Sequence, residues 1–268
     1  MKQNTEQLKE HYELEVKLAN RLKNSSFEER KTLYKEVYNE LFSKITHHPQ
    51  NYIKTSQQAQ DAYVKPQMEY LERFFNANTV FVEIGPGDCS LSFKISKFVK
   101  HVYAVDVSEE ITNANKVPKN FKLILSDGVT VPIEEKVDVV YSNQLIEHLH
   151  EDDVKLQLQN IYNALKVNGK YICITPSRLS GPHDISQYFD ENAKGFHLKE
   201  YTFEELNTLF KNIGFNSVYG FWGAKDSFVK IPSKIIIITE RLISKIPRKF
   251  RKNRVFASLL NIGIVGEK

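Results

Sequence analysis

The sequence predicts an α/β fold built on a mostly parallel β-sheet. Short apolar runs rich in β-branched residues alternate with segments in which apolar residues recur at helical spacing. Runs of the first kind are typical of buried parallel strands, and segments of the second kind of amphipathic helices. A glycine turn, Gly85-Pro86-Gly87, directly follows the first run at 80–84. Because glycine adopts positive φ and lets the backbone approach a ligand closely, this turn indicates a binding site.

Two amphipathic helices are predicted at the N-terminus, over 6–23 and 27–45. Ser26 and Glu29 form a capping box that begins the second helix. This helix carries a stripe of aromatic and aliphatic residues, for which a core or interface position is favoured over a substrate lid.

A polar loop is expected over 50–65, and Pro66 is expected to begin a third helix, where its missing N–H has no cost. His47 and His48 are assigned to a loop rather than to a metal site.

The remaining elements follow from the same two patterns. Strands are predicted at 80–84, 102–105, 121–125, 137–141, 170–175, 215–222 and 261–266, and helices at 91–99, 152–165 and 203–213. Thr202 and Glu205 form a second capping box, and Gly214 suits the position after the last helix. The stretch 177–201 shows no strong period, and irregular segments at the carboxyl end of a sheet often contact substrates.

Acidic residues follow the second and third strands. Asp106 ends the second strand twenty-one residues after Gly85, where a carboxylate can accept hydrogen bonds from both hydroxyls of a ribose. Asp127 follows the third strand, where a carboxylate can accept a hydrogen bond from an adenine amine. A nucleotide-type ligand is therefore expected along the carboxyl ends of the strands.

With these strand ends in hand, the sequence resembles the class I S-adenosylmethionine-dependent methyltransferases. The matching segments are Val-Glu-Ile-Gly-Pro-Gly at 82–87, Ala-Val-Asp at 104–106, Ser-Asp-Gly at 126–128 and Asp-Val-Val-Tyr-Ser-Asn-Gln-Leu-Ile-Glu-His-Leu at 138–149. The resemblance covers roughly residues 66–225 and the last strand. It implies a Rossmann-like, seven-stranded sheet of order 3-2-1-4-5-7-6 with its last strand antiparallel. It also implies an N-terminal helical cap over 1–65, on a methyltransferase domain over 66–268.

The resemblance implies S-adenosylmethionine as cofactor and S-adenosylhomocysteine as product. It places cofactor contacts at Glu83, Gly85, Pro86, Gly87, Asp106, Val107, Asp127, Gly128 and Asn143. Of these, Glu83 and the glycine turn belong to the methionine end, Asp106 to the ribose, and Asp127 with Gly128 to the adenine. The sequence departs from the family pattern at Cys89, where many members carry a third glycine.

Methyl transfer to an oxygen or nitrogen is helped by a general base, commonly histidine. His148 follows the fourth strand, and His183 and His197 lie in the irregular segment. Each of the three is a candidate base, and for each the alternative interpretation is a hydrogen-bonded structural histidine.

Glu147-His148 is similar to the end of the Glu-x-x-Glu-His metal site of the ubiquinone-pathway O-methyltransferases. Gln144 stands where that site has its first carboxylate. Because a neutral amide suits Mg²⁺ less well than a carboxylate, no metal is predicted.

The favoured activity is O-methylation of a small molecule, such as a glycan or secondary-metabolite precursor. The alternatives are a nicotinamide-dependent oxidoreductase and a non-catalytic S-adenosylmethionine-binding module. No nucleic acid partner is expected, because the net charge is only +4 and the two prolines of base-amine methyltransferases are missing after the fourth strand.

Two cysteines, a polar N-terminus and no apolar run of membrane-span length predict a cytoplasmic protein. The stretch 227–258 is expected to be a helical insertion before the last strand. Within it, 234–254 combines an apolar segment with a basic cluster at 245–254. A solvated excursion, a homodimer or lid element, and a peripheral membrane contact remain open for this segment.

Overall fold

The computed structural model describes residues 5–45, 57–108, 117–224, 227–253, 256 and 259–268. Within these residues one eight-stranded sheet runs in the order β3-β2-β1-β4-β5-β8-β6-β7. Its strands are β1 (Val80–Ile84), β2 (His101–Asp106), β3 (Phe121–Leu125), β4 (Val137–Asn143), β5 (Leu165–Thr175), β6 (Ser217–Ala224), β7 (Ser227–Pro232) and β8 (Ile262–Glu267). Strands β1 to β5 are parallel, and β8 lies antiparallel between β5 and β6.

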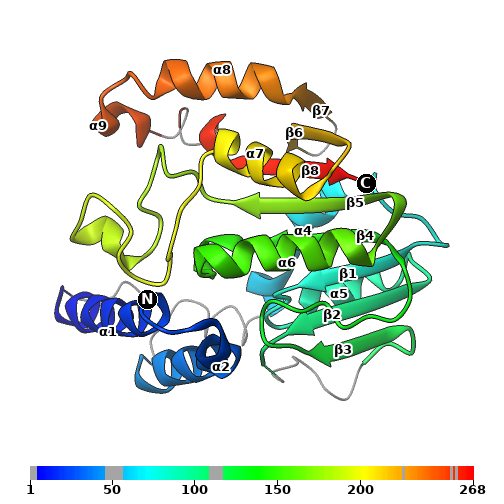
Figure 1. Cartoon of the computed structure of the whole chain (residues 1–268), viewed down its shortest axis with the longest axis horizontal. Coiled ribbons are helices and arrows are strands. Elements are labelled where there is room, and N and C mark those ends of the chain that lie inside the picture. The colour runs from blue at the N-terminus through cyan, green and yellow to red at the C-terminus, as the bar shows by residue number, and fades with distance from the viewer. Residues whose placement is uncertain (1–4, 46–56, 109–116, 225–226, 254–255, 257–258) are drawn as a thin grey trace.

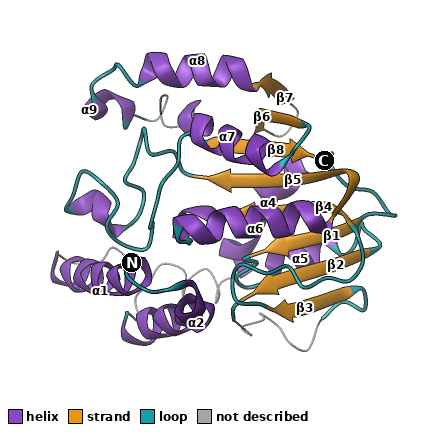
Figure 2. Ribbon diagram, viewed as in Figure 1, coloured by secondary structure: helices purple, strands orange, loops and turns teal. Residues whose placement is uncertain are grey.

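Helices cover both faces of the sheet (Figures 1 and 2). They are α1 (Thr5–Lys23), α2 (Phe27–Lys44), α4 (Gln57–Leu71), α5 (Ser90–Ile95), α6 (Glu151–Ala164), α7 (Phe203–Ile213), α8 (Ser233–Ile243) and α9 (Arg248–Arg251), with 3₁₀ turns η2 (Ile146–His148) and η3 (Ile185–Tyr188). One core joins α1, α2, α6 and α7 to Val80, Val82 and Ile84 of β1. The other joins α4 and α5 to Phe81 on the opposite face, as the alternation of side chains along a strand requires.

The observed order confirms the predicted 3-2-1-4-5-7-6 arrangement, in which β8 is the predicted seventh strand. The helical insertion expected over 227–258 is wrong in its first part. Ser227–Pro232 forms an additional edge strand that pairs with β6, with Phe221 opposite Lys230. Lys230 and Pro232 are residues that edge strands tolerate, so this strand lacks the apolar run by which the buried strands were found.

The expectation that Pro66 begins a helix is also wrong. Helix α4 starts nine residues earlier, at Gln57, and Pro66 lies inside it. Val64, Met68 and Leu71 are buried on one side of α4, so packing against the sheet offsets the hydrogen bond that the proline removes. Helix α5 ends at Ile95, earlier than the predicted 99. His47 and His48 lie outside the described residues.

Both predicted capping boxes are present. Ser26 and Glu29 begin α2, and Thr202 and Glu205 begin α7. Gly214 ends α7 with φ of 114°, as predicted for the position after a helix.

Candidate active site

The glycine turn at the carboxyl end of β1 has the conformation that its residues predict. Gly85 and Gly87 have φ of 71° and 57°. A Cβ at Gly85 would lie 3.0 Å from Leu145 Cδ1, so a side chain there would be both strained and crowded. Cys89, where the family pattern has a third glycine, also adopts a left-handed conformation with φ of 59°. The departure at Cys89 therefore keeps the turn geometry.

A hollow lies between this turn and the neighbouring strand ends, and we call it the glycine-turn hollow. Its lining includes Tyr34, Tyr38, Gly85, Asp106, Val107, Gly128, Leu145 and His148. Asp106 lies beside the turn because Ile84 pairs with Val105 in the parallel register. Four predicted cofactor residues therefore meet at one hollow: Gly85, Asp106, Val107 and Gly128.

The other predicted cofactor residues lie around the hollow. The Ser92 hydroxyl donates to Glu83 at 2.5 Å, and burial raises the pKa of Glu83 to about 8. Although partial burial opposes it, hydrogen bonds from the Thr130 and Val129 backbone lower the pKa of Asp127. Asp127 thus fixes its own turn, because one carboxylate oxygen accepts both of these bonds. Pro86 is a buried residue of the glycine turn.

Asn143 takes part in a network on the α4 side of the sheet. Its amide donates to the Tyr63 hydroxyl at 3.0 Å and to Gln67 Oε1 at 3.2 Å. The side-chain amide of Asn143, a predicted cofactor residue, therefore donates to two protein acceptors.

Tyr34 and Tyr38 were not among the predicted site residues, yet α2 brings both to the glycine-turn hollow. The aromatic stripe of the second helix was the available signal. The stripe itself does not tell whether an aromatic faces the core or a ligand. The structure shows that this stripe packs on the core and also closes the hollow.

A second hollow adjoins the first, and we call it the histidine hollow. Its lining includes Glu15, Tyr38, Phe42, Gln144, His148, His183, Asp184, Tyr188, Phe196 and His197. All three predicted histidines therefore line one space. Tyr38 and His148 line both hollows, so a group bound in one lies next to a group bound in the other.

The three histidines have different partners. His148 Nδ1 donates to the Phe196 carbonyl at 2.9 Å, and burial lowers the pKa of His148 to about 3. His197 Nδ1 donates to Glu200 at 2.8 Å, and although burial opposes it, this hydrogen bond raises the pKa of His197. His183 Nε2 donates to the Ser177 carbonyl at 3.1 Å, and burial lowers the pKa of His183.

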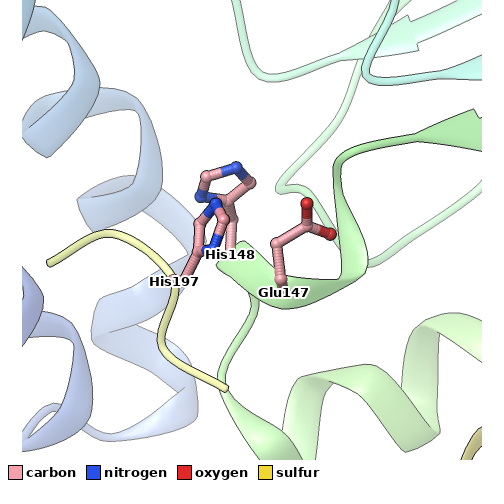
Figure 3. A group of neighbouring side chains, drawn as sticks. All are labelled: Glu147, His148 and His197. Carbon is pink, nitrogen blue, oxygen red and sulfur yellow. The ribbon is translucent and has the colours of Figure 1, made fainter. Parts of the chain in front are cut away.

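Glu147 lies beside the rings of His148 and His197 (Figure 3). It is fully buried, and burial raises its pKa to about 7. One oxygen accepts from the Thr175 hydroxyl at 2.9 Å, while the other has no hydrogen-bond partner. Glu147, His148 and His197 each offer one ligand atom, and these three atoms lie within 4.8 Å of one another. Among the described residues, this is the group that could hold a metal ion.

A family comparison identifies the domain. The model of a methyltransferase domain matches residues 82–173, from β1 through β5. This part of the chain is a class I S-adenosylmethionine-dependent methyltransferase domain. The enzyme is thus an S-adenosylmethionine-dependent methyltransferase, with S-adenosylhomocysteine as product. The antiparallel pairing of β8 with β5 is the arrangement of the last strand that the resemblance to class I methyltransferases implies.

Solved structures of methyltransferases share the fold. One from Archaeoglobus fulgidus is 18% identical, over 86% of this chain and all of the other, with a TM-score of 0.53. The Haemonchus contortus phosphoethanolamine N-methyltransferase 1 is 16% identical with a TM-score of 0.55, over 91% of this chain and 50% of its own length. The Burkholderia thailandensis 1,6-didemethyltoxoflavin-N1-methyltransferase is 14% identical with a TM-score of 0.50, over 81% of this chain and 85% of the other. A search of curated protein sequences finds no match.

Proposed function

We propose that this methyltransferase moves the methyl group of S-adenosylmethionine to a hydroxyl of a small molecule, such as a glycan or secondary-metabolite precursor. The observation that carries the proposal is that the glycine-turn hollow and the histidine hollow share Tyr38 and His148. In this proposal the cofactor occupies the first, with Asp106 at its ribose and Gly128 at its adenine. The acceptor then occupies the second, next to the sulfonium.

The reaction is an in-line displacement. The acceptor oxygen forms a bond to the methyl carbon as the carbon–sulfur bond breaks, and the electron pair of that bond stays on sulfur. Holding the two reactants in line supplies much of the acceleration. The hydroxyl proton must also leave, which requires a base near the histidine hollow.

Among the three candidate histidines, we assign the base to His183. Its Nε2–H is held by the Ser177 carbonyl, so Nδ1 carries the lone pair. Its side chain is exposed, which lets the proton pass on to solvent. His148 and His197 are buried deeper, beside Glu147.

The walls of the histidine hollow suit a ring. Tyr38, Phe42, Tyr188 and Phe196 line it, and aromatic faces pack on flat apolar surfaces while polar groups fix the orientation. A sugar or a phenolic ring is therefore the proposed acceptor.

The test is label transfer from methyl-labelled S-adenosylmethionine to a panel of sugars, phenols and matched amines. Label on a hydroxyl oxygen, located by NMR of the product, supports the proposal. Label confined to amine nitrogens would replace O-methylation with N-methylation, the reaction named for the Haemonchus and Burkholderia enzymes. Binding of S-adenosylhomocysteine without transfer to any acceptor class would contradict the proposed acceptors.

A second proposal concerns the surface of α8. Ile235, Ile238 and Leu242 are 55%, 58% and 61% exposed, and their spacing places them on one side of the helix. Phe250 is 52% exposed. Basic residues flank them at Lys245, Arg248, Lys249, Arg251 and Lys252. Exposed apolar residues bordered by cations are the features of a helix that lies at a membrane interface.

We propose that this α8 surface docks on an anionic membrane, from which the enzyme draws an amphiphilic acceptor. No helix among the described residues has the length and hydropathy needed to cross a bilayer. The Arg248 guanidinium donates to the Gly181 carbonyl at 2.6 and 3.1 Å. Because Gly181 lies two residues before His183, this contact connects the basic segment to the wall of the histidine hollow.

Sedimentation with vesicles tests the α8 surface. The enzyme should sediment with vesicles of phosphatidylglycerol and phosphatidylcholine, and much less with phosphatidylcholine alone. The double variant Ile238→Glu, Leu242→Glu should lose this binding, while Val167→Glu, at a 79% exposed site outside the α8 surface, should keep it. No vesicle binding by the wild type would contradict the proposal. A wild-type dimer that the double variant converts to a monomer would instead assign this surface to a second copy of the chain.

A further inference from the structure

We infer that Glu147, His148 and His197 bind a divalent metal cation that holds and activates the acceptor hydroxyl. The inference deepens the proposed function and rests on it for the role of the cation. The sequence argued against a metal because Gln144 replaces a carboxylate. The structure supplies a third ligand from elsewhere, since the segment around His197 folds back onto the turn that carries Glu147 and His148 (Figure 3).

The outer hydrogen bonds of the group are those that metal ligands have. His148 donates its Nδ1 proton to the Phe196 carbonyl, and His197 donates its Nδ1 proton to Glu200. Such bonds fix a ring and leave Nε2 as the nitrogen available to a metal. In both imidazoles, Nδ1 is therefore committed to a protein acceptor and Nε2 is available.

Glu147 gives the independent observation. Its Oε2 accepts from the Thr175 hydroxyl, which holds the carboxyl group in place. Its Oε1 is buried and has no partner, and a buried polar atom left in this state is costly. A cation between this oxygen and the two rings would satisfy it.

The donor set indicates the kind of cation. Two imidazoles and one carboxylate suit first-row divalent metals such as Zn²⁺ and Mn²⁺ better than Ca²⁺ or Mg²⁺, which favour oxygen ligands alone. Three protein ligands leave coordination positions open, as in catalytic rather than structural sites.

Because His148 and His197 line the histidine hollow, an acceptor bound there can reach an open position. A cation at this point lowers the pKa of a hydroxyl bound to it. His183 lies outside the ligand set and still receives the proton.

Calorimetric titration of the chelator-treated enzyme tests binding directly. Wild-type protein should bind one Zn²⁺ or Mn²⁺ per chain, and Glu147→Gln and His197→Gln should each weaken binding at least tenfold. Gln at position 147 keeps the bond from Thr175 and has nearly the same shape, so folding should survive. His183→Gln and His101→Gln should bind the cation as the wild type does. The first lines the same hollow, and the second lies at the far end of β2.

Two further measurements separate this inference from the proposed function. S-adenosylhomocysteine should bind the enzyme with and without the cation, whereas methyl transfer should be lost with chelator and return with Mn²⁺ or Zn²⁺. No cation binding by the wild type, or equal binding by Glu147→Gln and His197→Gln, would overturn the site. Binding with transfer indifferent to chelator would overturn its role in activating the acceptor. Failure of S-adenosylhomocysteine to bind would count against the glycine-turn hollow as the cofactor site, but it would not contradict the cation site.

Discussion

Arg30 of α2 and Asp153 of α6 form a buried, bidentate ion pair, with Nε and Nη2 of Arg30 at 2.6 and 2.7 Å from the two carboxylate oxygens. The Tyr34 hydroxyl donates to the same carboxylate at 2.7 Å and accepts from the His150 backbone N–H at 2.9 Å. Tyr34 lines the glycine-turn hollow. One carboxylate therefore attaches the N-terminal helices to the sheet domain and positions a wall of the glycine-turn hollow.

Breaking this pair should destabilise the protein strongly. Arg30→Ala leaves Asp153 charged and buried without its partner, and losing one member of a buried pair costs about 3–5 kcal/mol. Arg21→Ala is the matched control, because the Arg21 and Glu40 side chains are 41% and 27% exposed and solvent-accessible pairs contribute about 0–1 kcal/mol. Urea unfolding of both variants gives the comparison. Equal losses would mean that the buried pair does not hold α2 on α6.

Asp106 should contribute to cofactor affinity. If its carboxylate accepts hydrogen bonds from the ribose hydroxyls, Asp106→Ala should weaken S-adenosylhomocysteine binding by about 1–3 kcal/mol. Calorimetry with Glu72→Ala, at an exposed acidic position directly after α4, controls for a general effect of charge. Unchanged affinity in Asp106→Ala would remove Asp106 from the cofactor site.

The strand ends could be predicted from sequence because their signals are local. The run 80–84 and the glycines after it predict both the strand and its turn. Parallel pairing alone then places Asp106 beside that turn. The role of Tyr34 depends on Asp153, 119 residues away. The approach of His197 to Glu147 and His148 depends on a segment with no periodicity. Contacts of this kind are set by tertiary packing, which the spacing of residues along the chain does not encode.

Glu83 should make the stability of the cofactor-free protein fall as pH rises. Its pKa is about 8 in the folded state, against an ordinary value of 4.5. Between these values the folded protein holds a proton that the unfolded chain has lost, so stability decreases from about pH 4.5 and the loss is complete above about pH 8.

Glu83→Gln should remove this dependence. The variant should match the wild type near pH 4 and exceed its stability at pH 8.5 by a few kcal/mol, on the order expected for a shift of this size. Thermal or urea unfolding across this pH range measures the difference. The same variant should bind S-adenosylmethionine less tightly if the carboxylate serves the methionine end. Parallel stability curves for the two proteins would show that Glu83 ionises normally.

Gly128 should be required for the shape of the adenine end of the hollow. It has φ of 84°, and a Cβ there would lie 3.3 Å from Val107 and 3.5 Å from Tyr34, both of which line the glycine-turn hollow. Gly128→Ala should therefore cost about 1–2 kcal/mol of stability from the left-handed backbone and should weaken S-adenosylhomocysteine binding as well. Gly214→Ala is the informative control, because Gly214 also has a positive φ, of 114°, but a Cβ there would meet only Tyr162, at 3.5 Å, and Gly214 does not line the glycine-turn hollow. The two variants should lose similar stability, so that a larger loss of affinity in Gly128→Ala measures the crowding of Val107 and Tyr34. Equal affinities in the two variants would show that the adenine does not lie against Gly128.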